Sequence, residues 1–90
     1  MNTIIGHDSL GVKILSVSDL ELTVKVISLN DKYYERYLDL GKEYTLFKHK
    51  HACTDSMLLY EFTPNQMNRQ VSQLLLYWFD GCGWSFELDS

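Results

Sequence analysis

The stretch with the most reactive side chains is KHKHAC, residues 48–53. Alternate side chains of an extended strand point to the same side, so His49, His51 and Cys53 would offer two imidazole nitrogens and one thiolate to a zinc ion. Structural zinc sites more often show paired spacings of the CxxC or HxxxH kind. We therefore expect a solvated basic loop here without a metal ion, and we expect no cofactor elsewhere in the chain.

The same two histidines, with the lysines beside them, have the composition of an acid–base pair acting at an anionic substrate, as a nuclease requires. Proteins hold a phosphate backbone largely through Lys and Arg. This chain has 8 such residues against 12 Asp and Glu, which gives a formal net charge of −4. That balance disfavours a nuclease. We predict a protein that is not an enzyme and that does not bind nucleic acid directly.

A second group of candidates combines carboxylates with tyrosines. Four acidic residues recur at steps of four between residues 31 and 43, with three tyrosines interleaved. On a helix, the first three carboxylates would form a ridge beside the tyrosines. Such a ridge resembles a surface that occupies a basic active site, because carboxylates mimic phosphates and tyrosines supply rigid contact area. The predicted partner-binding residues are Asp31, Tyr33, Tyr34, Glu35, Tyr37, Asp39 and Glu43.

The segment that carries them, residues 30–40, fits two secondary structures. Its tyrosines share one helical face, whereas an alternating subset fits a strand. We favour a short helix or helical turn, with Asn30 or Asp31 as the N-cap and Gly41 at the end. The alternative to a partner-binding ridge is an ordinary solvated face whose charge is partly neutralised by the neighbouring lysines and arginine.

Length and composition favour one globular domain over residues 1–90, because a chain of 90 residues forms a single core. Cys53 and Cys82 are too few for a disulfide framework, and we find no leader pattern, so we expect a reduced cytoplasmic location. The longest apolar runs fall far short of the roughly 20 residues needed to span a bilayer, and we expect no membrane association.

A long helix is predicted over about residues 64–80. Thr63 can serve as its N-cap, Pro64 suits the first helical position, and Gln66 completes a capping box. Apolar residues then recur at helical spacing, and Gly81 can end the helix. The predicted apolar stripe consists of Met67, Val71, Leu74, Leu75 and Trp78.

Strands are predicted on both sides of this helix. Alternation of apolar and polar residues favours an antiparallel hairpin over residues 11–17 and 20–28. The other expected strands are a short strand or frayed end at 4–5, and strands around 44–47, 57–62 and 84–88.

Together these elements predict an α+β fold, in which an antiparallel sheet of about four to six strands carries the helix across one face. The end of the predicted helix would be apolar nearly all round, so Leu76, Tyr77 and Phe79 need a cover of their own. We favour cover by strands of the same chain over cover by a partner or a second copy.

A compact, acidic domain rich in tyrosine is typical of small proteins that neutralise a larger partner. We expect an immunity protein, a stoichiometric inhibitor that occludes the basic active site of a nuclease-like bacterial toxin domain. One alternative is a phage-encoded inhibitor of a bacterial defence protein. Another is a self-associating subunit, such as a homodimer.

Overall fold

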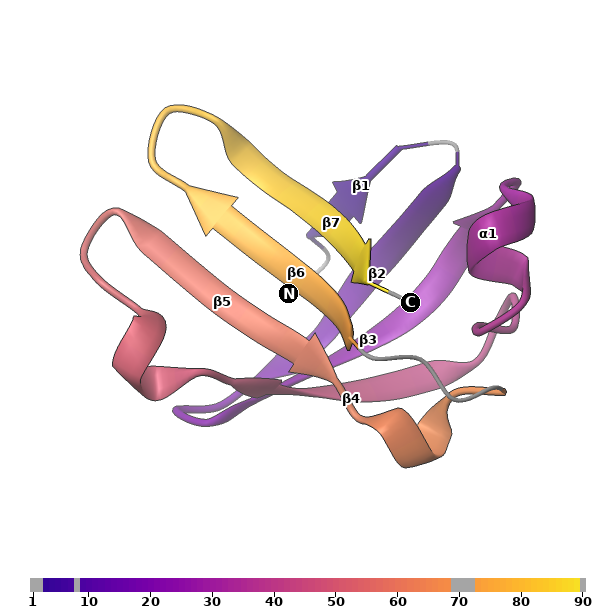
Figure 1. Ribbon diagram of the computed structural model, residues 1–90, viewed down its shortest axis with the longest axis horizontal. Coiled ribbons are helices and arrows are strands. Elements are labelled where there is room, and N and C mark those ends of the chain that lie inside the picture. Colours follow the sequence, from indigo (N-terminus) through magenta and orange to yellow (C-terminus); the bar gives the residue numbers. More distant parts are fainter. Residues whose placement is uncertain (1–2, 8, 69–72, 90) are drawn as a thin grey trace.

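Seven antiparallel strands curl into a nearly closed barrel in the part of the chain that the structure, a computed structural model, describes (Figure 1). This part comprises residues 3–7, 9–68 and 73–89. The order of the strands in the sheet follows their order in the chain, because each strand pairs with its sequence neighbours. The strands are β1 (Ile4–Gly6), β2 (Leu10–Val17), β3 (Glu21–Leu29), β4 (Glu43–Lys48), β5 (Met57–Phe62), β6 (Gln73–Phe79) and β7 (Gly83–Asp89).

Helical structure in the described residues is confined to three short segments. The α-helix α1 spans Lys32–Glu35, and two 3₁₀ turns span Lys50–Ala52 and Pro64–Gln66. The α+β prediction is therefore wrong, because the sheet closes on itself and carries no long helix across one of its faces within the described residues.

The strands that were predicted and the helical turn are confirmed, although the sheet has seven strands where about four to six were expected. The hairpin expected over residues 11–17 and 20–28 is formed by β2 and β3, with a register shift that accommodates one extra residue near Leu15. The remaining expected strands correspond to β1, β4, β5 and β7. The segment 30–40 does begin with a capped helical turn, although α1 ends at Glu35 and not near Gly41.

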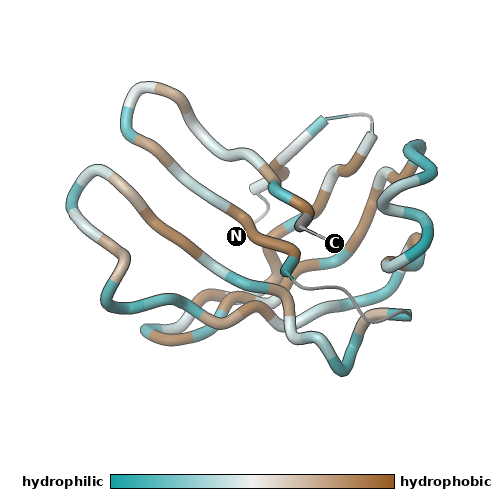
Figure 2. Tube along the Cα trace, viewed as in Figure 1, coloured by the Kyte–Doolittle hydropathy of each residue, from teal (hydrophilic) through white to brown (hydrophobic). Residues whose placement is uncertain are grey.

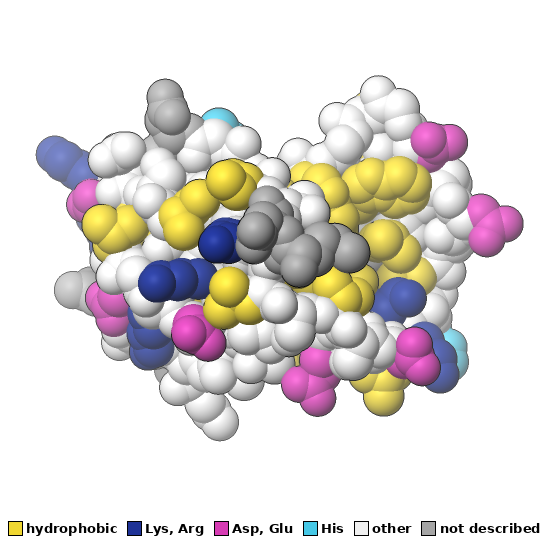
Figure 3. All heavy atoms as spheres, turned by 180° about the vertical axis from the view of Figure 1, so that it is seen from behind, with side chains coloured by type: hydrophobic (Ala, Val, Ile, Leu, Met, Phe, Trp, Pro, Cys, Tyr) yellow, Lys and Arg dark blue, Asp and Glu magenta, His cyan; other side chains and the backbone are white. Residues whose placement is uncertain are grey.

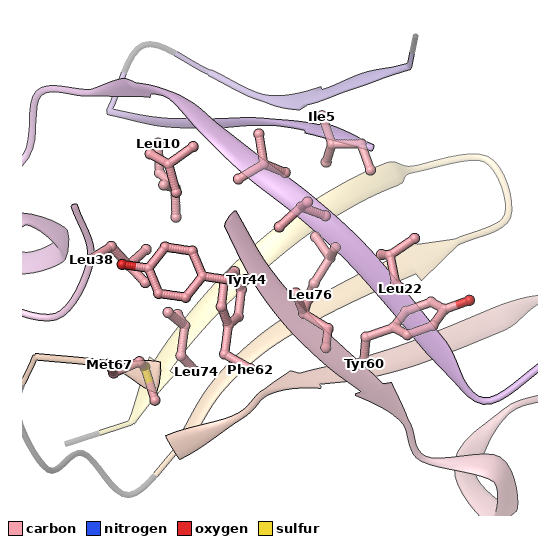
Figure 4. Packing of buried hydrophobic residues seen from close by; sticks show 14 of the residues in the cluster. Ile5, Leu10, Leu22, Leu38, Tyr44, Tyr60, Phe62, Met67, Leu74 and Leu76 are labelled. Atoms are coloured by element: carbon pink, nitrogen blue, oxygen red, sulfur yellow. The ribbon is translucent and has the colours of Figure 1, made fainter. Parts of the chain in front are cut away.

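Alternating residues of the strands fill the barrel, as the hydropathy pattern along the strands indicates (Figure 2). Figure 4 shows Leu38, Tyr44, Met67 and Leu74 together at one end of this core. Leu22, Tyr60 and Leu76 lie towards the other end. The most deeply buried side chains are Tyr44, Phe62, Leu10, Leu22, Leu38, Leu46, Leu74, Leu76, Val12, Val24 and Val26.

Two connections close one end of the barrel together. The connection between α1 and β4 buries Tyr37 and Leu38, and the connection between β5 and β6 buries Met67. The backbone N–H of Asn68 donates to the carbonyl of Tyr37 at 2.9 Å, and its side-chain amide donates to Oδ1 of Asp39 at 2.8 Å. The connection that follows α1 is thus fixed to the connection between β5 and β6.

The helix predicted over residues 64–80 is replaced by a 3₁₀ turn and strand β6. Pro64 does occupy the start of a helical turn. The hydroxyl of Thr63, however, donates to the carbonyl of Thr45 at 2.7 Å, and Oε1 of Gln66 accepts from the N–H of Thr45 at 2.8 Å. The residues that resemble a capping box therefore fasten the turn to β4.

The apolar run that follows forms a strand because a hairpin partner lies directly after it. Leu76 is fully buried inside the barrel, whereas Tyr77 and Phe79 belong to the outer side of β6. The strands β6 and β7 are joined by Asp80, Gly81 and Cys82, with Gly81 at a φ of 84°. An Asp-Gly pair between apolar runs is a strong hairpin signal. Of the predicted helical stripe, Val71 lies outside the described residues.

The barrel closes where β1 meets β7. Gly6 has a φ of 105°, and a Cβ atom at this position would collide with the carbonyl oxygen of Leu10 and with the ring of Phe86. The hydrogen-bonded order of the sheet begins at β1 and ends at β7. Close packing at a glycine thus brings the first and last strands together.

Replacing Gly6 with Ala should destabilise the protein by about 3 kcal/mol, since it combines a strained positive φ with overpacking. Gly81→Ala is the matched control, because Gly81 also has a positive φ but an added Cβ would meet nothing within 4 Å. That control should cost about 1–2 kcal/mol. Urea unfolding measures both values, and equal losses would contradict tight closure at Gly6.

Candidate functional site

The N-terminus of α1 is organised by Asp31. Its carboxylate accepts a hydrogen bond from the backbone N–H of Tyr33 at 2.8 Å, and its carbonyl accepts one from the N–H of Glu35 at 2.9 Å. The helix continues into a tight turn in which the carbonyl of Tyr34 accepts from the N–H of Leu38 at 2.9 Å. Asp31 therefore fixes where the two adjacent tyrosines lie.

A shallow, open hollow of about 250 Å³ lies between α1 and the end of β7. We call it the tyrosine hollow, and it is lined by Asp31, Tyr33, Tyr34 and Leu88. Tyr33 is 64% exposed. Tyr34 is half-buried and meets Phe86 edge to face, with ring centroids 6.4 Å apart. Tyr34 is thus anchored to the core, whereas Tyr33 is exposed to solvent.

The pKa of Tyr34 is raised above its ordinary value of 10.0. Burial of the phenol is the larger cause, because it penalises the charged phenolate. The neighbouring carboxylate of Asp31 is the second cause and acts in the same direction. The charge of Asp31 thus couples this residue to Tyr34, which keeps its proton at neutral pH.

The other predicted partner-binding residues are dispersed. Tyr37 is buried in the closed end of the barrel, and Asp39 accepts a hydrogen bond from Asn68. Glu43 lies at the start of β4, opposite Lys25 in the sheet. Since α1 is four residues long, only Asp31 and Glu35 stand on one helical turn, and the acidic ridge predicted from steps of four does not form.

The histidines and Cys53 are separated by their own partners. Nε2 of His49 lies 2.8 Å from Oε1 of Glu61, and the thiol of Cys53 accepts from the N–H of Leu59 at 3.4 Å. His51 is exposed in the 3₁₀ turn Lys50–Ala52. Within the described ranges, no group of three His, Cys, Asp or Glu side chains is arranged to hold a metal ion. Cys53 and Cys82 are both free thiols.

Sequence reasoning missed a second surface, on the outside of β4, β5 and β6. We call it the outer aromatic face and define it by Phe47, Leu59, Tyr77 and Phe79. Leu59 is opposite Tyr77 in the sheet, and the rings of Tyr77 and Phe79 stack with centroids 5.6 Å apart. Phe47 and Phe79 are each 39% exposed. Assigning residues 74–79 to a strand would have revealed this face, because alternate side chains of a strand share a side.

Polar pairs lie within the outer aromatic face and at its border. The hydroxyl of Tyr77 donates to Oε2 of Glu87 at 2.6 Å, and this hydrogen bond is the largest cause that raises the pKa of Tyr77. Glu61, only 8% exposed, pairs with His49 within the face, on the middle strand and opposite Phe47. On the back of the molecule as well, hydrophobic side chains gather in patches bordered by both basic and acidic side chains (Figure 3).

Comparisons with family models, curated proteins and solved structures find no match to this chain. Among the described residues, no helix is long and apolar enough to cross a membrane. Function must therefore be inferred from the surfaces themselves.

Asp31→Asn should lower the pKa of Tyr34 towards its ordinary value of 10.0, without reaching it. The substitution removes the negative charge that opposes the phenolate, while burial, the larger cause, remains. Asn caps a helix about as well as Asp, so α1 should persist. An NMR pH titration of the tyrosine ring carbons measures the shift. Glu35→Gln is the control, and a pKa of Tyr34 that stays the same in Asp31→Asn would contradict the proposed coupling.

Proposed function

We propose that this chain is a small protein-binding inhibitor of the immunity kind. It occupies a basic surface of a nuclease-like toxin domain, and α1 with the tyrosine hollow lies at the centre of the contact. The observation that carries the proposal is the grouping of Asp31, Tyr33 and Tyr34 around one open hollow. The chain acts by occlusion, without turnover, in the cytoplasm.

The chemistry of the hollow supports this proposal. Tyrosine is enriched at the energetically dominant positions of protein interfaces, because its large ring is rigid and its hydroxyl remains polar. Tyr33 presents such a ring at 64% exposure, and Leu40, equally exposed, adds an apolar group on the connection that follows α1. Asp39, exposed on the connection that follows α1, supplies a further carboxylate. The net charge of −4 favours encounter with a basic partner.

The anchoring of α1 adds to the same argument. A four-residue helix has almost no stability of its own. Asn68, however, ties the connection that follows α1 to the connection between β5 and β6, and Tyr34 packs against Phe86. A surface fixed in this way loses little conformational entropy when it binds.

A phage-encoded inhibitor of a bacterial defence protein would use the same surface in the same way. The gene neighbourhood distinguishes the two proposals, because an immunity gene accompanies a toxin reading frame, whereas an anti-defence gene lies among phage genes.

Tyr33→Ala should weaken binding to a cognate basic toxin domain at least ten-fold, which corresponds to about 1.4 kcal/mol. The toxin domains to test first are any encoded beside this gene, and isothermal titration calorimetry gives the affinity. Tyr77→Ala is the matched control, since it removes a tyrosine from the outer aromatic face. Equal binding by the wild type and Tyr33→Ala would contradict the proposed surface.

The outer aromatic face supports a second candidate function, assembly with a second copy of the chain. Exposed aromatic groups on neighbouring strands are typical of interaction surfaces. Tyr77 and Phe79, which were expected to need a cover, do lie on this face, whereas Leu76 belongs to the core.

Self-association predicts that light scattering after size exclusion gives twice the monomer mass of 10.5 kDa. Phe79→Ser should then restore the monomer, because it removes an exposed ring from the contact. Tyr33→Ala should leave the dimer intact. A wild-type monomer at high micromolar concentration would reject this candidate and leave the inhibitor proposal unaffected.

A further inference from the structure

The tyrosine hollow combines two features, namely exposed aromatic ring area and a carboxylate at the same rim. Tyr33 and Tyr34 supply the rings, and Leu88 supplies an apolar wall. One carboxylate offers about four acceptor positions. The helix cap from the N–H of Tyr33 uses one of those on Asp31, so its carboxylate retains acceptor capacity for a ligand.

This combination suits a cation that is flat, partly apolar and rich in hydrogen-bond donors. The faces of tyrosine rings attract cations within about 6 Å, and a carboxylate accepts charge-assisted hydrogen bonds. A guanidinium group can interact with a tyrosine ring and with the carboxylate at the same time, because its face stacks on the ring while its edge donates to the carboxylate. An ammonium group is a compact, strongly hydrated charge that gains less from stacking.

We propose that the tyrosine hollow is the seat of one arginine side chain of the protein partner. The guanidinium stacks on the ring of Tyr33 and donates to Asp31, and the aliphatic stem of the arginine lies along Leu88. This inference rests on the proposed function and names the residue of the basic partner that the surface recognises.

The size of the hollow fits a single side chain. Its volume of about 250 Å³ is below the roughly 300–1,000 Å³ of pockets that enclose a cofactor or a drug-sized ligand. The nearby charges Lys32 and Arg36 belong to the same segment, but neither lines the hollow. Glu35 also lies outside it, and this makes Glu35 a matched control for the charge of Asp31.

The test is an NMR titration of the 90-residue chain, labelled with ¹⁵N and ¹³C, against the peptide acetyl-Gly-Arg-Gly-amide. The arginine peptide should shift the backbone signal of Tyr33 and the ring signals of Tyr33 and Tyr34 in a saturable way. A peptide with citrulline in place of arginine keeps the shape and loses the charge, so its affinity should be at least ten-fold weaker. A lysine peptide should also bind more weakly than the arginine peptide.

Two charge variants test whether the arginine binds at Asp31. Asp31→Asn retains a helix cap and should weaken binding of the arginine peptide at least ten-fold, whereas Glu35→Gln should change it less than two-fold. The inference is overturned if citrulline binds as well as arginine. It is also overturned if the two variants lose equal affinity, because that result indicates diffuse attraction to the acidic surface.

Failure here is distinguishable from failure of the proposed function. If Tyr33→Ala abolishes binding of a toxin domain while the arginine and citrulline peptides bind alike, the arginine seat is rejected and the inhibitor function stands. If the arginine peptide binds selectively while no basic toxin domain binds, the seat stands and the inhibitor function is rejected.

Discussion

The structure depends on the contact between the two connections that close one end of the barrel. Leu38 and Met67 cover the apolar interior there, and burial of side chains of this size is worth about 2 kcal/mol each. The polar part of the contact comes from Asn68, which binds Tyr37 and Asp39 on the other connection. Since α1 is too short to persist alone, its position and the shape of the tyrosine hollow follow from this closure.

The strands could be predicted from the sequence because their pattern is local. Leu22, Val24 and Val26 alternate with polar residues in β3, and the structure places all three in the core. The position of α1 was equally accessible, since Asp31 can cap a helix whatever packs against it. The closure of the sheet into a barrel could not be predicted, because it depends on the approach of β1 to β7 at Gly6, and no local pattern encodes that approach.

The predicted long helix failed because two valid local signals competed. Thr63, Pro64 and Gln66 do favour a helical turn, but one turn satisfies them once their side chains bind Thr45. The run after them is apolar on every side, so periodicity alone cannot separate a buried helix from a strand with two apolar faces. Pairing with β7, which follows directly in the chain, favours the strand over the helix. The same error hid the outer aromatic face, whereas Tyr33 and Tyr34 were selected for their chemistry and do line a hollow.

The strand order also bears on how the chain is made. Each strand from β2 onwards pairs with the strand synthesised just before it, so the sheet can grow by successive addition as the polypeptide leaves the ribosome. The meeting of β1 with β7 is different, because it joins the first and last strands of the sheet and must wait until β7 has emerged. Until then, the apolar lining of an incomplete barrel faces water, and crowded nascent chains are most prone to aggregate during that interval.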